Sequence, residues 1–497
     1  MINPKTTFIL FLLTALCMIT ISGCMVGPNF SEIAPGPDAI IDRSNNWGDF
    51  PITDMLDPAS LAQTRQWWKT FNDPVLNELI SKAESDNLTL MAAGLRVLEA
   101  QALRGIAVGE LFPQVQQING NYSRVNLSEN TANIFPVDNF DNYNMSFDVV
   151  WELDVWGRFR RGIEVADAQM YSSIMSLNDV WVTITAEIAS AYFELCALDR
   201  RIELIRKNID IQRSTLNLAT VKYENGATTE LDVQQARSTL KNVESFLPLL
   251  EVGMQSTKNR LCVLLGVGPG ELNDMLSTHG EIPLPPEKIT VGLPADLLRR
   301  RADIRQAELI AKAECARIGI AESELLPHFS LFGSAGFEAE DLDRVFTGTG
   351  FSGSIGPSFR WNILNYGRIE NNVKAQEARF QQAIVNYRLK GITALNEVSN
   401  AMTAYIKTRD QVEKLTESVA ATQRSFELAS KQYKYGQVDF QRVLSTQSFL
   451  VQQQDSLASA KRDVVQNLIV LYKSLGGGWE ITNPNNLAVK NETLTYP

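Results

Sequence analysis

Apolar residues between positions 184 and 209 recur in alternating steps of four and three. They are Ile184, Ile188, Ala191, Leu195, Leu198, Ile202, Ile205 and Ile209. A mean step of 3.5 residues keeps one seam of an α-helix against a partner only when the helices wrap around each other. After Gly226 the same rhythm resumes through Ala236, Leu240, Val243, Leu247, Leu250, Met254, Leu261 and Leu264. We therefore predict an outgoing helix, a turn near Gly226 and a returning helix.

The outgoing helix is predicted to be unusually long. At about 1.5 Å per residue, a helix from near Arg158 to Tyr223 spans on the order of 100 Å. Helices of globular bundles usually run for about 8 to 20 residues, so a buried globular bundle is the less favoured alternative.

A different period comes before this helix. Two segments near 113–125 and 143–153 mix apolar and polar residues, and an Asn-rich stretch separates them. In the second segment Met145, Phe147, Val149 and Trp151 occupy alternate positions. Alternation with a period of two predicts a β-hairpin with strands of about ten residues.

The order of strands, outgoing helix, tip and returning helix then repeats. Three landmarks recur exactly 210 positions later: Trp156-Gly157-Arg158 as Tyr366-Gly367-Arg368, Gly226 as Gly436, and Leu265-Gly266 as Leu475-Gly476. A fourth, Glu110-Leu111-Phe112-Pro113, recurs as Glu324-Leu325-Leu326-Pro327, 214 positions later. We infer an internal duplication, with further strands near 327–338 and 350–361 and a second helical hairpin with its tip near 436.

The second outgoing helix has a weaker seam than the first. Every seventh residue from Val398 to Tyr433 is apolar or aromatic, but the companion positions turn polar from Arg409 onward. This polar side is either an ordinary solvated face or the lining of a wet channel. We therefore expect the first hairpin to be the firmer wall and the second the more mobile part.

Four amphipathic strands cannot close a membrane barrel. An open edge would leave unpaired backbone groups in lipid, and single-chain barrels begin at about eight strands. Other copies of the chain must therefore supply the missing strands.

The N-terminus has the pattern of a lipoprotein signal. Lys5 precedes a nearly continuous apolar run from Phe8 to Ile21, which ends in Ser22-Gly23-Cys24. The run of about 14 residues is short for a membrane-spanning helix, and a small-residue cleavage site follows it directly. The alternative is an uncleaved signal anchor in which Cys24 is incidental.

Composition excludes several classes of function. The chain has 497 residues, 44% of them hydrophobic and 21% charged, with a net charge of -11, which argues against a nucleic-acid partner. His279 and His328 are the only histidines, so a His-rich metal or acid–base site is not expected. No Gly-rich phosphate loop with Lys, metal-ligand cluster or nucleophile with its base is evident, so we predict no enzyme.

Cysteine usage predicts no disulfide framework. Once the signal segment is removed and Cys24 is set aside, Cys196, Cys262 and Cys315 remain. Three scattered thiols read as buried small apolar residues, and pairing of Cys196 with Cys262 is possible without being favoured.

Taken together, these motifs resemble the TolC-like outer-membrane efflux proteins, in particular the lipoprotein branch of NodT-like outer-membrane factors. The matching residues are Cys24 with Val26-Gly27-Pro28-Asn29-Phe30, Trp67-Trp68-Lys69-Thr70-Phe71-Asn72-Asp73-Pro74, Leu293-Pro294, Arg301-Ala302-Asp303-Ile304-Arg305-Gln306-Ala307-Glu308 and the two tips.

The resemblance implies a mixed fold of α-helices and membrane β-strands, built from a duplicated unit of two strands and a long helical hairpin. Three copies would form one 12-stranded barrel in the Gram-negative outer membrane, continued by an α-helical periplasmic tunnel. It also implies an S-diacylglycerol and an N-palmitoyl group on Cys24, and no other cofactor.

The function that the resemblance implies is the exit duct of a tripartite efflux pump. The homotrimer would receive substrates from an inner-membrane transporter through a periplasmic adaptor. Drugs, metals and polypeptides all stay open as substrates. The rival hypothesis is a structural trimeric coiled-coil surface lipoprotein, which would not require a strand pair before each hairpin.

In this family gating and adaptor contact lie at the inner helix tips, which correspond here to 226–236 and 436–447. The candidate gate residues are Gly226, Asp232, Gly436, Asp439 and Arg442. Like charges from three copies around a narrow axis would repel and favour opening unless Arg or Lys pairs with them.

Each acid also has a purely structural explanation, because a carboxylate at a helix N-terminus is stabilised by the helix dipole. Relatives often carry a further Asp at the position of Ser445, so an acidic double ring stays open here.

The expected division of the chain is a signal peptide at 1–23, a lipidated tether at 24–62, the first repeat at 63–270, a linker at 271–292, the second repeat at 293–478 and a tail at 479–497.

Overall fold

The computed structural model describes residues 25–31, 66–128, 139–277, 282–283 and 300–479. The chain divides into two compact units. The strand unit comprises Met1–Ile33, Arg96–Ser173 and Gln306–Tyr387, and the helical unit comprises Ala34–Leu95, Ile174–Arg305 and Arg388–Pro497. Each unit therefore combines segments from both sequence repeats. The signal segment, Cys24 and His279 lie outside the described residues.

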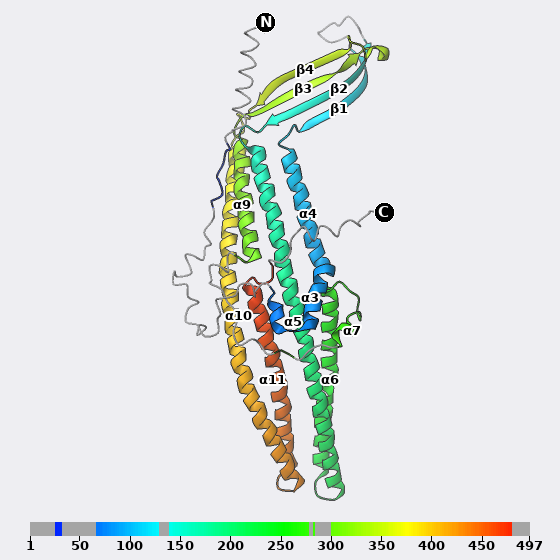
Figure 1. The fold of residues 1–497 in the computed structure, drawn as a ribbon, viewed down its shortest axis with the longest axis vertical. Coiled ribbons are helices and arrows are strands. Elements are labelled where there is room, and N and C mark those ends of the chain that lie inside the picture. Colours follow the sequence, from blue (N-terminus) through cyan, green and yellow to red (C-terminus); the bar gives the residue numbers. More distant parts are fainter. Residues whose placement is uncertain (1–24, 32–65, 129–138, 278–281, 284–299, 480–497) are drawn as a thin grey trace. The chain divides into compact units, whose positions relative to one another are not determined.

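The strand unit contains a four-stranded antiparallel sheet with the order β1-β2-β3-β4 (Figure 1). The strands are β1 (Val115–Asn126), β2 (Asn139–Leu153), β3 (His328–Ala339) and β4 (Phe351–Arg360), with the short 3-10 helix η3 (Leu342–Arg344) between the last two. The predicted strand ranges lie within four residues of these bounds. Within the described residues, β1 and β4 each pair along one side only.

Helices continue directly from this sheet. α5 (Arg158–Glu224) begins after Gly157, whose φ is +77°, and the Asp154 carboxylate accepts hydrogen bonds from the backbone N–H groups of Phe159 (3.0 Å) and Arg160 (3.1 Å). These bonds satisfy donors that the first turn of a helix leaves free. The first turns of α5, most of α4 (Leu88–Gly109), most of α9 (Ala302–Ser323) and the start of α10 (Arg368–Lys434) complete the strand unit.

The helical unit contains two hairpins of matched dimensions. Both outgoing helices, α5 and α10, have 67 residues, and both returning helices, α6 (Glu230–Leu264) and α11 (Phe440–Ser474), have 35. The equal lengths agree with the duplication inferred from the sequence. The remaining elements are η2 (Trp67–Phe71), α3 (Pro74–Asp86) and α7 (Asn273–Leu276).

The predicted seam of α5 is buried along its whole length. All eight of its apolar positions from Ile184 to Ile209 have at most 6% of their surface exposed. α5 is also the one helix among the described residues that is long and apolar enough to cross a membrane, but 72% of its most apolar window is buried within the protein. The seam is therefore core, as its periodicity predicts.

Polar contacts join the first hairpin to the second along α5 and α11. The Arg201 guanidinium binds both carboxylate oxygens of Asp455, at 2.7 and 3.1 Å. One step nearer the tip, Asn208 donates to the Gln454 side chain at 3.2 Å. In the helical unit α5 thus packs against its own returning helix and against α11.

The three described cysteines, Cys196, Cys262 and Cys315, are unpaired and buried. This confirms that they act as small core residues. Burial raises the pKa of the Cys196 thiol to about 12, which keeps it protonated and unreactive.

Candidate functional site

The register of the sheet separates its residues into one apolar and one polar face. Ile118 pairs with Phe147, Phe147 with Ala335, and Ala335 with Gly353, so these residues share a face. The same face carries Tyr122, Tyr143, Met145, Val149, Trp151, Phe329, Leu331, Phe337, Phe351, Ile355, Pro357 and Phe359. An apolar face of this size matches the lipid-facing side of a membrane barrel.

The opposite face is hydrogen-bonded. The Asp148 carboxylate accepts from Ser334 Oγ at 2.6 Å, Asn119 Nδ2 at 2.6 Å and Ser146 Oγ at 3.0 Å. At the start of β3, His328 Nδ1 lies 2.8 Å from Glu152 Oε1. A polar face of this kind suits the water-filled interior of a channel.

The two helix tips are built identically. Gly226 and Gly436 have φ values of +72° and +76°, a region that residues with a Cβ rarely occupy. At the first tip, Gly226 N donates to Tyr223 O (2.9 Å) and Ala227 N to Lys222 O (2.8 Å). The matching bonds at the second tip, from Gly436 N and from Gln437 N, measure 3.0 and 2.9 Å. Both are Schellman turns, which explains why glycine stands at both positions.

The candidate acids occupy the starts of the returning helices. Asp439 is the N-cap of α11, and its Oδ1 accepts from the backbone N–H of Arg442 at 3.0 Å. Asp232 lies in the first turn of α6, where it accepts a hydrogen bond from the Thr228 hydroxyl. Both acids therefore have the structural role that competes with gating, and Asp439 is also exposed.

The other candidates at the second tip are exposed. Within the described part of the chain, no carboxylate lies at ion-pair distance from the Arg442 guanidinium. Ser445 donates its hydroxyl to Arg442 O at 3.0 Å.

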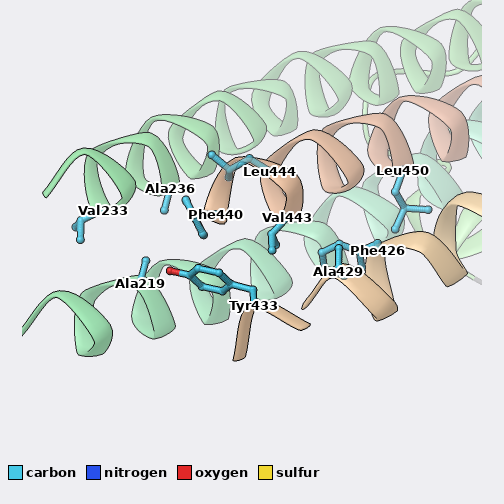
Figure 2. Close-up of a cluster of buried hydrophobic side chains, with 10 residues drawn as sticks. All are labelled: Ala219, Val233, Ala236, Phe426, Ala429, Tyr433, Phe440, Val443, Leu444 and Leu450. Atoms are coloured by element: carbon cyan, nitrogen blue, oxygen red, sulfur yellow. The ribbon is translucent and has the colours of Figure 1, made fainter. Parts of the chain in front are cut away.

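A single hydrophobic cluster joins the two tips (Figure 2). Ala219, Val233 and Ala236 of the first hairpin pack in it with Phe426, Ala429, Tyr433, Phe440, Val443, Leu444 and Leu450 of the second. The rings of Tyr433 and Phe440 lie 5.2 Å apart. Because one cluster contains residues of all four helices, the two hairpin ends of one chain form one packed body.

Lys222 adds a polar tie between the same tips. Its Nζ donates to the backbone carbonyl oxygen of Tyr433 at 2.6 Å and lies 4.3 Å from the centre of the Tyr433 ring. Sequence patterns do not predict this contact, because no spacing rule relates residues 211 positions apart. The available signal was that each residue lies just before a tip glycine: Lys222 is four residues before Gly226, and Tyr433 is three residues before Gly436.

The segment after Cys24 is bound to the strand unit. The buried guanidinium of Arg161 donates to Val26 O (3.1 Å), Gly27 O (3.0 Å) and Asn29 Oδ1 (2.9 Å). Val26 N also donates to the backbone carbonyl oxygen of Trp156 at 3.0 Å, next to the end of β2. Residues 25–31 are thus held where the membrane strands give way to helices.

Comparison with known proteins identifies relatives along most of the chain. The profile of the outer membrane efflux protein family matches residues 79–267 and 293–477. The pyoverdine export outer membrane protein OpmQ of Pseudomonas putida is 30% identical over 437 residues, which cover 86% of this chain and 91% of that protein. Nodulation protein T of Rhizobium leguminosarum bv. trifolii is 26% identical over 93% of this chain and 96% of its own length.

Solved channels have the same fold. The outer-membrane channel OprN has a TM-score of 0.84 and 28% identity, and the match covers 92% of this chain and all of that one (100%). VceC of Vibrio cholerae has a TM-score of 0.77 and 26% identity, covering 84% of this chain and 99% of its own. These matches confirm the mixed fold of helices and membrane strands.

Proposed function

The chain belongs to the outer membrane efflux protein family, and we propose that three copies of it form one closed duct whose inner end is gated at the two helix tips. The protein is an outer-membrane channel of an efflux system. The rival hypothesis is a surface stalk without transport, and it does not account for the amphipathic sheet.

The observation that carries the proposal is that the outer strands of the sheet, β1 and β4, each pair on one side only among the described residues. The apolar face of the sheet suits lipid, yet unpaired backbone groups at the outer edges of β1 and β4 would be costly there. Pairing β4 of one copy with β1 of the next closes the sheet and keeps neighbouring strands antiparallel. Three copies supply twelve strands, an even number within the range of known barrels.

An apolar stripe on α6 supports assembly at the helices. Phe246, Leu249 and Val252 are spaced three residues apart and are exposed in the single chain, the latter two by 68%. On the equivalent returning helix α11, the position matching Val252 is Arg462, which pairs with Glu194 of α5 within the chain (3.4 Å). We infer that α6 forms an apolar joint, that is, a contact between neighbouring copies. The equivalent part of α11 instead forms a polar contact inside each copy.

The gate in this proposal is the packed body at the tips. In the resting state, the shared cluster and the contact of Lys222 with Tyr433 hold the second hairpin against the first. Opening then separates the two tips, and the exposed charges of Asp439 and Arg442 act on ions at the entrance. In this proposal one tip moves relative to the other, and the second hairpin, expected from its weaker seam to be the more mobile part, is the one that moves away.

The partners in this proposal are a periplasmic adaptor and an inner-membrane transporter, because the related proteins include outer-membrane components of efflux pumps. We assign the chain no catalytic step and no cofactor beyond its lipid. The duct is passive, and the energy for export comes from the transporter.

We further propose that Cys24 carries the lipid anchor. The segment that follows it is bound beside the ends of the membrane strands, which is a suitable place for acyl chains to enter the outer membrane. Mass spectrometry of the N-terminal peptide tests this directly. A free Cys24 thiol, or a chain that still begins at Met1, would contradict it.

The test of the duct is the conductance of the detergent-purified protein after insertion into planar bilayers, with its mass measured in the same preparation. A trimer that conducts ions is expected. A monomer that inserts without conducting would refute the proposal.

A further inference from the structure

A cavity of about 580 Å³ in the strand unit has a strongly basic wall. It lies between α9 and the start of α10, and three arginines, Arg317, Arg368 and Arg379, line it against one carboxylate, Glu324. The protein as a whole carries a net charge of -11, so this local excess of positive charge is unusual for the chain.

The wall formed by α10 presents donors. Arg368, Asn372, Gln376 and Arg379 stand four, four and three residues apart, so they form one stripe of the helix. Gln376 Nε2 donates to Asn372 Oδ1, and Arg379 Nη1 donates to Gln376 Oε1, both at 3.3 Å. Because these two amide oxygens are already engaged, the stripe offers N–H groups to the cavity.

The nearby carboxylates are engaged as well. Glu324 binds Arg158 at 3.1 Å, and Glu314 pairs with Arg317 at 3.3 Å. No carboxylate of the described residues lies within 4.0 Å of the guanidinium of Arg368 or Arg379. Arg368 is also the first residue of α10, where the helix dipole adds positive potential. The cavity therefore has positive charge without a matching anion.

One arginine links the cavity wall to the polar face of the sheet. Arg158, which binds Glu324 of the cavity wall, also lies 3.6 Å from Glu152 on that face. The N-terminal segment covers a different side of α9, where Cys315 Sγ contacts Pro28 O at 3.7 Å. On α9, Cys315 and Arg317 are two residues apart, so they point about 200° apart around the helix. In the proposed duct the basic wall thus faces the lumen.

We propose that this cavity is a luminal binding subsite for small solutes with two or more carboxylates. Guanidinium groups bind carboxylates through paired, charge-assisted hydrogen bonds, and two of them on one helix stripe can hold a polycarboxylate at two points. The subsite concentrates such anions on their way through a channel whose overall charge would otherwise repel them. This inference rests on the trimeric duct proposed above.

Block of single-channel current by citrate tests the subsite. The full-length protein is compared with Arg368→Gln/Arg379→Gln, and with Lys374→Gln as the matched control. Lys374 is an exposed cation of the same helix, about 120° around the helix axis from the Arg368 position. The citrate concentration for half-block is expected to rise about tenfold or more in the double variant, since one charge-assisted bond contributes about a decade in an equilibrium constant. The control should match the wild type.

The outcomes separate this inference from the duct itself. A protein that does not conduct would refute the duct. A conducting protein that citrate does not block, or that loses block equally in Lys374→Gln, would overturn the subsite while leaving the duct intact. If the double variant fails to assemble, Arg379→Gln alone serves instead, with partial rescue expected from Arg379→Lys and the same half-block criterion.

Discussion

The ammonium group of Lys222, near the end of α5, lies 2.6 Å from the carbonyl oxygen of Tyr433, near the end of α10. The two residues belong to different hairpins, and each comes just before its tip glycine. A bond in this position joins the hairpins at their ends, where it opposes their separation most effectively. It is also within reach of water, so its contribution to the closed state should be modest.

Replacing Lys222 with methionine should favour the open state. Methionine keeps most of the apolar stem but loses the charge-assisted hydrogen bond and the cation–π contact, which together contribute on the order of 1–2 kcal/mol at a partly exposed site. Basal conductance in bilayers should rise about fivefold to thirtyfold, since 1.4 kcal/mol corresponds to a factor of ten. Lys434→Met, which removes a nearby exposed charge with no such contact, should conduct like the wild type. Equal conductance of Lys222→Met and wild type would remove this contact from the gate.

Substitutions at Asp439 separate helix capping from electrostatic gating. Asparagine caps nearly as well as aspartate, whereas alanine costs about 0.5–2 kcal/mol. If the charge acts on ions, Asp439→Asn changes leak conductance while its thermal stability stays that of the wild type. Stability lost in Asp439→Ala, with wild-type conductance in Asp439→Asn, would leave only the capping role.

Arg442→Ala is the companion variant. Its guanidinium has no ionic partner among the described residues, so trimer yield should be unchanged while leak conductance shifts. If Arg442→Ala and Asp439→Asn both conduct normally, neither charge belongs to the gate.

Neighbouring residues of β4 test which face of the sheet meets lipid. Ile355 is 81% exposed on the apolar face, and Ser354 lies on the polar face opposite Ser334. Ile355→Lys should destabilise the barrel by about 2–4 kcal/mol if the site is near the bilayer midplane. Ser354→Lys should be tolerated. Urea unfolding in lipid vesicles measures both, and a larger loss for Ser354→Lys would reverse the assigned faces.

The apolar stripe of α6 provides a test of assembly. Val252→Asp places a charge in the proposed joint between copies and should lower trimer yield, since a charge without a partner is costly to bury. Gln255→Asp adds the same charge further along α6, about 120° around the helix axis from Leu249 at the centre of the stripe, and should assemble normally. Size-exclusion chromatography with mass detection distinguishes them. Trimers of equal yield would move the joint elsewhere.

Asp179 makes the stability of the helical unit depend on pH. Burial, and then the charge of Asp303, raise the pKa of Asp179 above its ordinary value of 3.8, against the opposing effects of Lys390, Arg301 and Lys473. Ionisation of an acid whose pKa is raised in the folded state lowers the stability of that state. The loss of stability is therefore complete at pH values above the folded-state pKa and absent below pH 3.8. Asp179→Asn should therefore melt at a higher temperature than wild type at pH 8. The difference should vanish as the pH falls toward 4, and a difference independent of pH would contradict the assignment.

Much of the architecture could be predicted because its signals are periodic. The seam from Ile184 to Ile209 predicted a long helix, and the 210-residue offset between Gly226 and Gly436 predicted a second hairpin with the same turn. These features depend on local geometry, namely helix period, strand alternation and the positive φ of a Schellman turn. Such geometry is visible in the order of residues along the chain.

The contacts between the repeats could not be predicted in this way. Lys222 and Tyr433 meet only because the two hairpins pack together, and Arg161 meets Val26 only because the N-terminal segment returns to α5. Neither pair has a period or spacing that marks it. Asp439 illustrates a further limit, since its position after the tip agrees equally with a gate and with a cap, and only its bond to Arg442 N identifies the cap.

The central claim is that each chain supplies one third of a closed barrel. Electron cryomicroscopy of the protein in lipid nanodiscs tests it most directly, because the strands around the ring can be traced to their copies. The expected result is a ring of three copies in which β4 of each pairs antiparallel with β1 of the next. A ring with another number of copies, or particles in which the β1 and β4 edges remain unpaired, would contradict it.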